Sequence, residues 1–198
     1  MPILGSRGGA SVRAFGRFAT TAAPDIDVMF PLQVVTVGAA GASSVSFTNI
    51  PSTYNHLQMR GILRKTGAAT SNYITFNNDS GSNYSLHFLA GNGSVASAYA
   101  EINTNYAYVY GTDDTQTANI YSPFVMDILD YKNTNKNKTV RMLNGLELND
   151  YLGGYGQIYL HSFVWRNSTD AINSIKIVPA LGSHKQYSHF ALYGIKGA

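Results

Sequence analysis

Apolar and polar side chains alternate through most of the chain. In the segment at residues 55–64, Leu57 and Met59 fall on one face, and Gln58 and Arg60 fall on the other. This period of two is typical of an antiparallel strand with one buried face. Similar runs recur from Phe30 onward and predict strands near residues 32–37, 43–49, 55–64, 72–77, 84–90, 98–110 with a break, 120–131, 138–144, 155–166, 171–178 and 186–196.

Short clusters of Gly, Asn, Asp and Ser separate these runs, as at residues 77–81 and 111–114. Such clusters favour turns, because these residues accept unusual backbone angles or bond to their own backbone. No helical stretch of about 10–15 residues lies between the runs to connect parallel strands. The sequence therefore predicts an all-β fold, an antiparallel, jelly-roll-like β-sandwich at residues 30–198, preceded by an extended N-terminal docking arm at residues 1–29.

Two segments need closer attention. In residues 124–131 the apolar positions fit a helical turn through Val125 and Leu129, but they fit a strand through Phe124 and Met126, which we favour. In residues 155–166 both alternating sets are apolar. This pattern predicts a strand that is buried on both faces, either central in the sandwich or covered by a neighbouring subunit. The two sets are Tyr159, His161, Phe163 and Trp165 on one face and Ile158, Leu160 and Val164 on the other.

Charge is scarce and unevenly distributed. Charged residues make up 13% of the 198 positions, and the net charge is +3. Arg7, Arg13 and Arg17 lie in residues 1–24 without any acid, whereas residues 25–198 carry equal numbers of basic and acidic side chains. Since nucleic-acid affinity needs clustered positive charge, we expect no nucleic-acid partner. The absence of cysteine excludes disulfides and thiolate metal sites.

Residues 1–24 have no regular apolar period and are rich in Gly, Ala and Ser. Such a segment cannot bury enough apolar surface to form a core by itself. We therefore interpret it as a docking arm that binds other proteins of an assembly. Phe15 and Phe18 would fill pockets and the three arginines would pair with acids; the alternative is a terminus folded back on its own domain. No apolar run reaches the roughly 18 residues of a membrane span, and we expect no membrane insertion and no Sec-type export.

No catalytic motif is recognisable. The chain lacks G-x-S-x-G, H-E-x-x-H, a P-loop and G-x-G-x-x-G, and its five histidines are scattered. Asp127 and Asp130 are predicted on opposite strand faces, where they could not act as a pair. The turn at residues 77–79 offers oxygen ligands for calcium but lacks the bidentate Glu of a calcium loop. We expect no catalytic residue, no metal and no cofactor.

Tyr106, Tyr108 and Tyr110 alternate with Ala107 and Val109, which places three phenol rings on one face of a predicted strand. A row of tyrosines can stack on sugar rings or anchor a protein interface, because each ring combines apolar area with a hydroxyl group. It can also stabilise the sheet by packing across strands. The sequence leaves sugar binding, a subunit or partner interface, and internal packing open.

Several stretches resemble the structural proteins of tailed-bacteriophage particles. The opening GSRGGASVRAFG at residues 5–16 is similar to the short N-terminal segment of many such proteins. The body resembles β-rich domains of tail-fibre, receptor-binding and other virion proteins. The stretches that carry this likeness are YNHLQMR at 54–60, NNDSGSNYS at 77–85, DILDY at 127–131 and FALYGIK at 190–196.

This resemblance implies a non-enzymatic virion protein, assembled in the cytoplasm of a bacterial host. Its arm would dock on other virion proteins, its body would form a homotrimer, and its loops would contact host surface glycan as part of a tail or fibre adhesin. The first alternative is a capsid decoration protein that stabilises the head. The second, a glycan depolymerase, would need a carboxylate pair in a groove.

Overall fold

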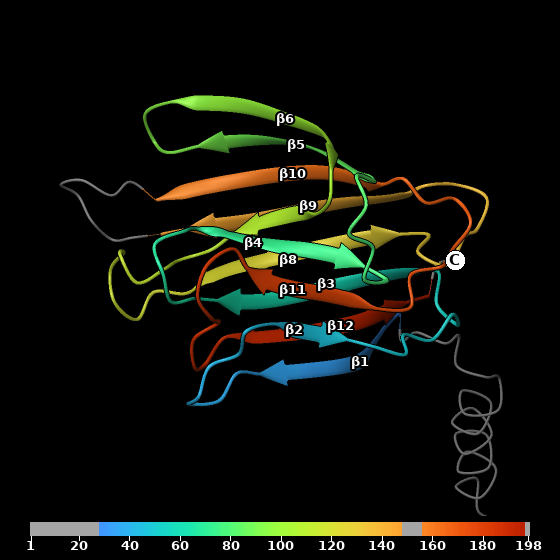
Figure 1. Ribbon diagram of the computed structural model, residues 1–198, viewed down its shortest axis with the longest axis horizontal. Coiled ribbons are helices and arrows are strands. Elements are labelled where there is room, and N and C mark those ends of the chain that lie inside the picture. The colour runs from blue at the N-terminus through green and yellow to red at the C-terminus, as the bar shows by residue number, and fades with distance from the viewer. Residues whose placement is uncertain (1–27, 148–155, 197–198) are drawn as a thin grey trace, which may run out of the picture.

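The computed structural model describes residues 28–147 and 156–196, and within these ranges it contains strands and no helix (Figure 1). The twelve strands are β1 (Met29–Thr36), β2 (Val45–Phe47), β3 (His56–Leu63), β4 (Ser71–Phe76), β5 (Tyr84–Gly91), β6 (Ala96–Thr104), β7 (Ala107–Tyr110), β8 (Ser122–Leu129), β9 (Lys138–Leu146), β10 (Gln157–Trp165), β11 (Ile175–Pro179) and β12 (His189–Ile195).

The strands form two antiparallel sheets that pack face to face (Figure 1). The large sheet has the order β1-β12-β3-β8-β9-β10-β5-β6, and the small sheet has the order β2-β11-β4-β7. The chain moves between the sheets after most strands, and late strands insert between early ones, as in a jelly roll. The hairpin of β9 and β10 widens the large sheet between β8 and β5. The predicted fold class, an all-β antiparallel sandwich, is confirmed.

Alternation along each strand produces the core. In β8 the side chains of Phe124, Met126 and Ile128 are buried, and Val125 and Leu129 are exposed. The segment at 124–131, which also fitted a helical turn, is therefore a strand up to Leu129, as predicted. Its buried residues join apolar side chains of the small sheet, because the two inner faces must exclude water from each other.

β10 corrects one prediction. Tyr159, Phe163 and Trp165 face the core, but Ile158 and Leu160 on the other face are 58% and 47% exposed. The strand is central in the large sheet, between β9 and β5. Burial on both faces is wrong for the single chain, because no second layer of the described residues covers the outer side of this sheet. A neighbouring subunit on that side stays a prediction.

Asp79 fixes the loop between β4 and β5. One of its carboxylate oxygens accepts hydrogen bonds from Trp165 Nε1 at 2.6 Å and Asn83 Nδ2 at 2.9 Å, and the other accepts one from the Gly81 amide at 2.8 Å. Partial burial acts to raise the pKa of Asp79, but the bonds from Trp165, Asn83 and Gly81 together lower it below its usual value. The oxygens of Asp79, which the sequence offered as possible calcium ligands, therefore accept hydrogen bonds within the protein.

Asn77 acts in the same loop. Its side-chain Nδ2 donates a hydrogen bond to the Ala171 carbonyl at 2.8 Å, and its Oδ1 accepts one from the backbone amide of Asn173 at 2.9 Å. The backbone of Asn77 and Asn78 has positive φ angles of 51° and 54°, which asparagine tolerates better than most residues. Within the described ranges, no group of three or more His, Asp or Glu side chains could hold a metal ion.

We expect Asp79→Ala to lower the free energy of unfolding by about 2–4 kcal/mol. Hydrogen bonds to a charged acceptor contribute about 1.5–3 kcal/mol each, and the buried Trp165 N–H would lose its partner. Urea denaturation measures this loss. Asp114→Ala is the control, because Asp114 forms an exposed ion pair with Lys185 that we expect to contribute less than about 1 kcal/mol. Equal losses in the two variants would contradict this account of the loop.

Candidate functional site

The small sheet is too narrow to cover the large one. Its edge strand β7 packs near β9 and β5, and beyond it the inner face of the large sheet is open (Figure 1). Every residue of β6 is exposed or half-buried, so this strand is covered on neither face. The flank formed by β10, β5 and β6 is therefore a ledge alongside β7.

Four aromatic rings occupy this ledge, and we call them the aromatic shelf: Phe88, Tyr99, Tyr110 and Tyr159. Phe88 is at the centre, with its ring centroid 5.2 Å from that of Tyr99, 5.7 Å from that of Tyr110 and 5.8 Å from that of Tyr159. Tyr110 and Tyr159 stack at 4.5 Å. The rings come from β5, β6, β7 and β10, so the shelf bridges the two sheets at their open side.

Tyr99 is the ring that solvent reaches most easily, with 46% of its surface exposed. Its hydroxyl donates a hydrogen bond of 2.6 Å to Glu101 Oε1, two residues along the same strand. That bond raises the pKa of Tyr99, and partial burial and the charge of Glu101 act in the same direction. Ser97, Tyr99 and Glu101 share one face of β6, because every second side chain of a strand points to the same side. This face carries a polar edge beside an aromatic surface.

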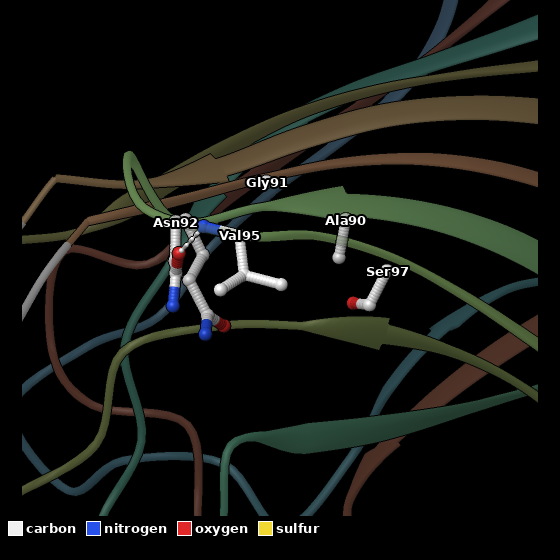
Figure 2. A pocket seen from close by; sticks show the side chains of 6 residues that line it. Ala90, Gly91, Asn92, Val95 and Ser97 are labelled. Carbon is white, nitrogen blue, oxygen red and sulfur yellow. Dashed lines mark hydrogen bonds between the residues drawn. The ribbon is translucent and has the colours of Figure 1, made fainter.

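A small cavity continues the shelf at the end of β5 and β6 (Figure 2). Its volume is about 110 Å³, and it is lined by Ala90, Gly91, Asn92, Val95, Ser97 and Gln157. Enclosed ligand pockets usually measure about 300–1,000 Å³, so this cavity can hold one end of a ligand that extends over the shelf. The Gln157 side chain accepts a hydrogen bond from the Tyr159 hydroxyl, which links the cavity to the shelf.

The floor beneath the shelf is polar, and a short chain of hydrogen bonds links its side chains to β7. His161 is 1% exposed, and its Nε2 lies 2.8 Å from Asn144 Oδ1. Asn144 Nδ2 donates to the Tyr110 carbonyl at 3.0 Å, which leaves Oδ1 as the acceptor and assigns the proton to Nε2. Burial lowers the pKa of His161 to about 4, so the imidazole is neutral near pH 7. Asn144 therefore ties β9 to β10 and β7.

The tyrosines of the site are not acids at physiological pH. Burial raises the pKa of Tyr159 to about 12, and the charge of Tyr110 adds to the shift. Burial also raises the pKa of Tyr110. The hydroxyl groups therefore remain protonated, and they can donate and accept hydrogen bonds but do not supply a nucleophile.

The predicted tyrosine row is divided: Tyr106, which precedes β7, packs apart from Tyr108 and Tyr110, whose rings contact each other and Phe88. Tyr108 is buried and packs edge-on against Phe88 at 6.3 Å, while Tyr106 stacks on Tyr73 at 3.8 Å in the small sheet. Tyr110 joins the shelf, and its ring meets that of Tyr108 at 70°. The three rings do not form one flat surface, because β7 is an edge strand whose neighbours differ along its length. Internal packing, one of the three interpretations, accounts for Tyr108.

Sequence reasoning missed the residues that make the shelf a surface. The strand containing Tyr99 and Glu101 was predicted, and so was the strand containing Phe88, but neither residue was chosen as a site residue. The Ser-x-Tyr-x-Glu alternation at 97–101 was the available signal. The arm residues chosen for docking lie outside the described residues: Arg7, Arg13, Phe15, Arg17 and Phe18.

The candidate carboxylates are each engaged. Asp127 accepts a hydrogen bond from Gln58 at 2.7 Å and faces Arg141 at 3.7 Å. Asp130 pairs with Lys136, and the hydrogen bond from Lys136 lowers the pKa of that carboxyl. The predicted placement of both residues on opposite faces of one strand is wrong, because β8 ends at Leu129 and Asp130 lies in the following turn with a positive φ of 49°; each carboxylate has its own basic partner.

A second pair of polar side chains, Lys65 and His184, is buried where the chain leaves β3 and β11, and their backbones form an isolated bridge. Lys65 is fully buried and donates to the Ser71 carbonyl; burial lowers the pKa of Lys65 to about 8, against the opposing charge of Asp113. His184 is also fully buried, and burial lowers its pKa to about 4. The Ile177 backbone opposes that shift, but neither ring nitrogen meets a partner with hydrogen-bond geometry among the described residues.

Comparisons of the chain with protein-family models, with curated proteins and with solved structures gave no match. No helix in the part of the chain that the structure describes has the length and apolar character needed to cross a bilayer. The site is thus characterised by its own geometry: an aromatic ledge with a neighbouring carboxylate, amide groups and a small cavity.

The two buried histidines predict a loss of stability in mild acid. The unfolded chain takes up protons near the ordinary pKa of 6.5, whereas folded His161 and His184 resist protonation until about pH 4. Stability therefore falls as pH decreases from about 6.5 to about 4, by on the order of 3 kcal/mol for each histidine. Asp79 and Asp130, with pKa values below the usual 3.8, act at lower pH.

Urea unfolding at several pH values between 4 and 7 measures this loss. His184→Leu removes one of the two groups, and the unpartnered ring nitrogens make this replacement inexpensive near pH 7. We expect the variant to retain about half of the acid sensitivity of the natural sequence. An unchanged dependence on pH would contradict the assignment to His184.

Proposed function

We propose that the protein is a carbohydrate-binding β-sandwich that serves as a non-enzymatic, adhesin-type component of a phage particle. The observation that supports carbohydrate binding is the exposed ring of Tyr99, held on Phe88 and bonded to Glu101 beside a small polar cavity. The particle assignment rests on the sequence resemblance described above.

The chemistry of a sugar ring suits this arrangement. One face of a pyranose presents C–H groups, which pack favourably on an aromatic ring, and its edge presents hydroxyl groups. Carboxylate and amide groups satisfy such hydroxyls because they accept, or both accept and donate, hydrogen bonds in a plane. Tyr99 and Phe88 would supply the packing surface. Glu101, Gln157 and Asn92 would bind the hydroxyl groups.

The size and charge of the site indicate the class of sugar. A cavity of about 110 Å³ suits one substituent or terminal hydroxymethyl group, with the rest of the chain lying over the shelf. The shelf and the cavity lining contain no charged side chain, and the charged group that adjoins them is Glu101, which is bonded to Tyr99. We therefore propose neutral oligosaccharides as ligands in preference to strongly anionic ones, which Glu101 would repel.

An array of neutral and acidic bacterial surface glycans tests binding, and titration calorimetry with the strongest neutral oligosaccharide measures affinity. We expect Tyr99→Ala to weaken binding by about tenfold or more, because the packing of one aromatic ring is worth about 0.5–1.5 kcal/mol and its bond to Glu101 is lost as well. Glu101→Gln, which keeps the shape, should relax the preference against acidic glycans.

Tyr187→Asn is the matched control. Tyr187 is exposed and lies in the turn before β12, and asparagine tolerates its positive φ of 72°. Its replacement should leave affinity unchanged. Absence of binding to every glycan on the array, or equal affinity in the Tyr99 variant, would contradict the proposed sugar site.

Deletion of residues 1–24 tests the docking arm separately. Since β1 begins at Met29, we expect the shortened chain to unfold at the same urea concentration as the full chain but to be absent from purified particles. Circular dichroism measures folding, and immunoblotting of particles measures incorporation. Loss of folding would assign residues 1–24 to the body, and normal incorporation would remove their docking role.

A further inference from the structure

The outer face of the large sheet carries most of the exposed apolar side chains of the described residues. This face points away from the small sheet, so nothing in the described chain covers it (Figure 1). Nine of the fourteen large apolar side chains that are exposed lie on it: Val34, Ile62, Leu89, Ile102, Val125, Leu129, Leu143, Ile158 and Leu160.

These side chains are organised by register. One row of paired residues crosses all eight strands, from β6 at one edge to β1 at the other. Four consecutive members on β5, β10, β9 and β8 are large and apolar, the charged Arg60 follows them on β3, and two alanines lie nearer the ends of the row. In order, the row is Ala98, Leu89, Leu160, Leu143, Val125, Arg60, Ala191 and Val34.

The next row is polar and contains a paired charge at its centre. Arg141 of β9 lies directly opposite Asp127 of β8, with 3.7 Å between Nη2 and Oδ2. Gln58 of β3 donates to the other oxygen of Asp127 at 2.7 Å, and Arg60 donates to Gln58 at 2.7 Å. Apart from histidines, the outward positions of the eight strands hold only three charged side chains: Arg60, Asp127 and Arg141.

The dimensions of this face fit a stable protein interface. Eight strands spaced about 4.8 Å apart, each about 27 Å long, cover about 900–1,000 Å². A stable complex buries about 800 Å² on each partner, so the face is large enough to form one. Charge is scarce over the face as a whole, as is typical of the buried part of interfaces, and the charges that are present lie on the central strands β3, β8 and β9.

We propose that this face binds a second copy of the chain, with a two-fold axis that runs parallel to the strands between β8 and β9. This rotation places β9 of one copy over β8 of the other. Arg141 then lies over Asp127 of the second copy, and Leu143 lies over Val125 of the second copy. The face is therefore complementary to itself in charge at Arg141 and Asp127 and in apolar character at Leu143 and Val125, while Leu160 lies over Arg60 of the second copy.

The same rotation matches large residues with small ones. Leu89 lies over Ala191 of the second copy, and Val34 lies over Ala98 of the second copy. Such pairing lets two sheets approach to the usual separation of about 10 Å with their side chains interleaved. A dimer of this kind covers Ile158 and Leu160, the side chains that a solitary chain leaves exposed on its central strand.

Light scattering and sedimentation equilibrium of the full chain, over a range of concentrations, test the proposal. We expect a dimer for the natural sequence and a dissociation constant raised by at least about a hundredfold in Leu143→Glu, because each buried pair of introduced carboxylates lacks a partner. Leu181→Glu is the control, since Leu181 is similarly exposed but lies outside this face. A monomer or a trimer for the natural sequence overturns the proposal.

Charge exchange gives a second test that does not depend on the apolar row. Asp127→Arg alone and Arg141→Asp alone each place like charges opposite one another between copies, and each should weaken the homodimer by about tenfold or more. Mixing the two variants restores both pairs in a heterodimer. Recovery of association on mixing supports the arrangement, because a defect within one chain would persist.

The double variant Asp127→Arg with Arg141→Asp keeps the pair within the chain and between copies, so it should associate like the natural sequence. Circular dichroism establishes that each single variant is folded before its association is compared. Failure of the mixture to associate, or homodimers that tolerate both single exchanges, overturns the proposed axis. A heterologous protein on this face would leave the purified natural chain monomeric, which also overturns the proposal.

Discussion

Four strands cannot cover eight, and the accessible surfaces of this molecule follow from that mismatch. The small sheet buries the middle of the large one, where the alternation of apolar side chains provides the core. Beyond the edge of the small sheet, the strands of the large sheet keep their alternation, but their inward side chains are no longer fully buried. Inward side chains of β10, β5 and β6 meet partly water and partly β7. Aromatic residues suit such a boundary because they tolerate contact with both.

The rigidity of the aromatic shelf depends on the polar floor below it. Asn144 bonds to His161 and to the Tyr110 carbonyl of β7, so the edge strand is held at a fixed distance from the large sheet. A floor of apolar side chains would pack without specifying this separation. Neutral imidazole is required for the arrangement, since a buried charge there would have no anionic partner. Neutral His161 therefore both helps to position the shelf and contributes to the sensitivity of the fold to acid.

Much of the fold was accessible from the sequence because it depends on local alternation. The period of two located nearly all of the strands, and it identified the segment around Phe124 as a strand. It could not show how many strands each sheet holds. For that reason β10 was expected to be covered on both faces, and the exposed side of Leu160 was missed.

The candidate site was less accessible, because it combines three consecutive strands, β5, β6 and β7, with the distant strand β10 and depends on how the two sheets lie against each other. Tyr110 was chosen for its alternation with Val109, but Phe88 and Tyr99 become notable only when β5 and β6 are seen to extend past β7. The docking residues Phe15 and Phe18 lie outside the described residues and remain predictions. Register and sheet width are long-range properties, whereas composition and alternation are local ones.

The interleaved strand order also constrains how the chain can fold. β12 lies between β1 and β3, and β11 lies between β2 and β4, so strands made early in synthesis are separated by strands made late. Until β11 and β12 have left the ribosome, β1 and β2 lack the neighbours that pair with them. The part of the sandwich that contains β1 and β2 must therefore form after translation of the body is nearly complete. Such non-local pairing is slow, and the waiting strand edges are surfaces on which a chaperone can act.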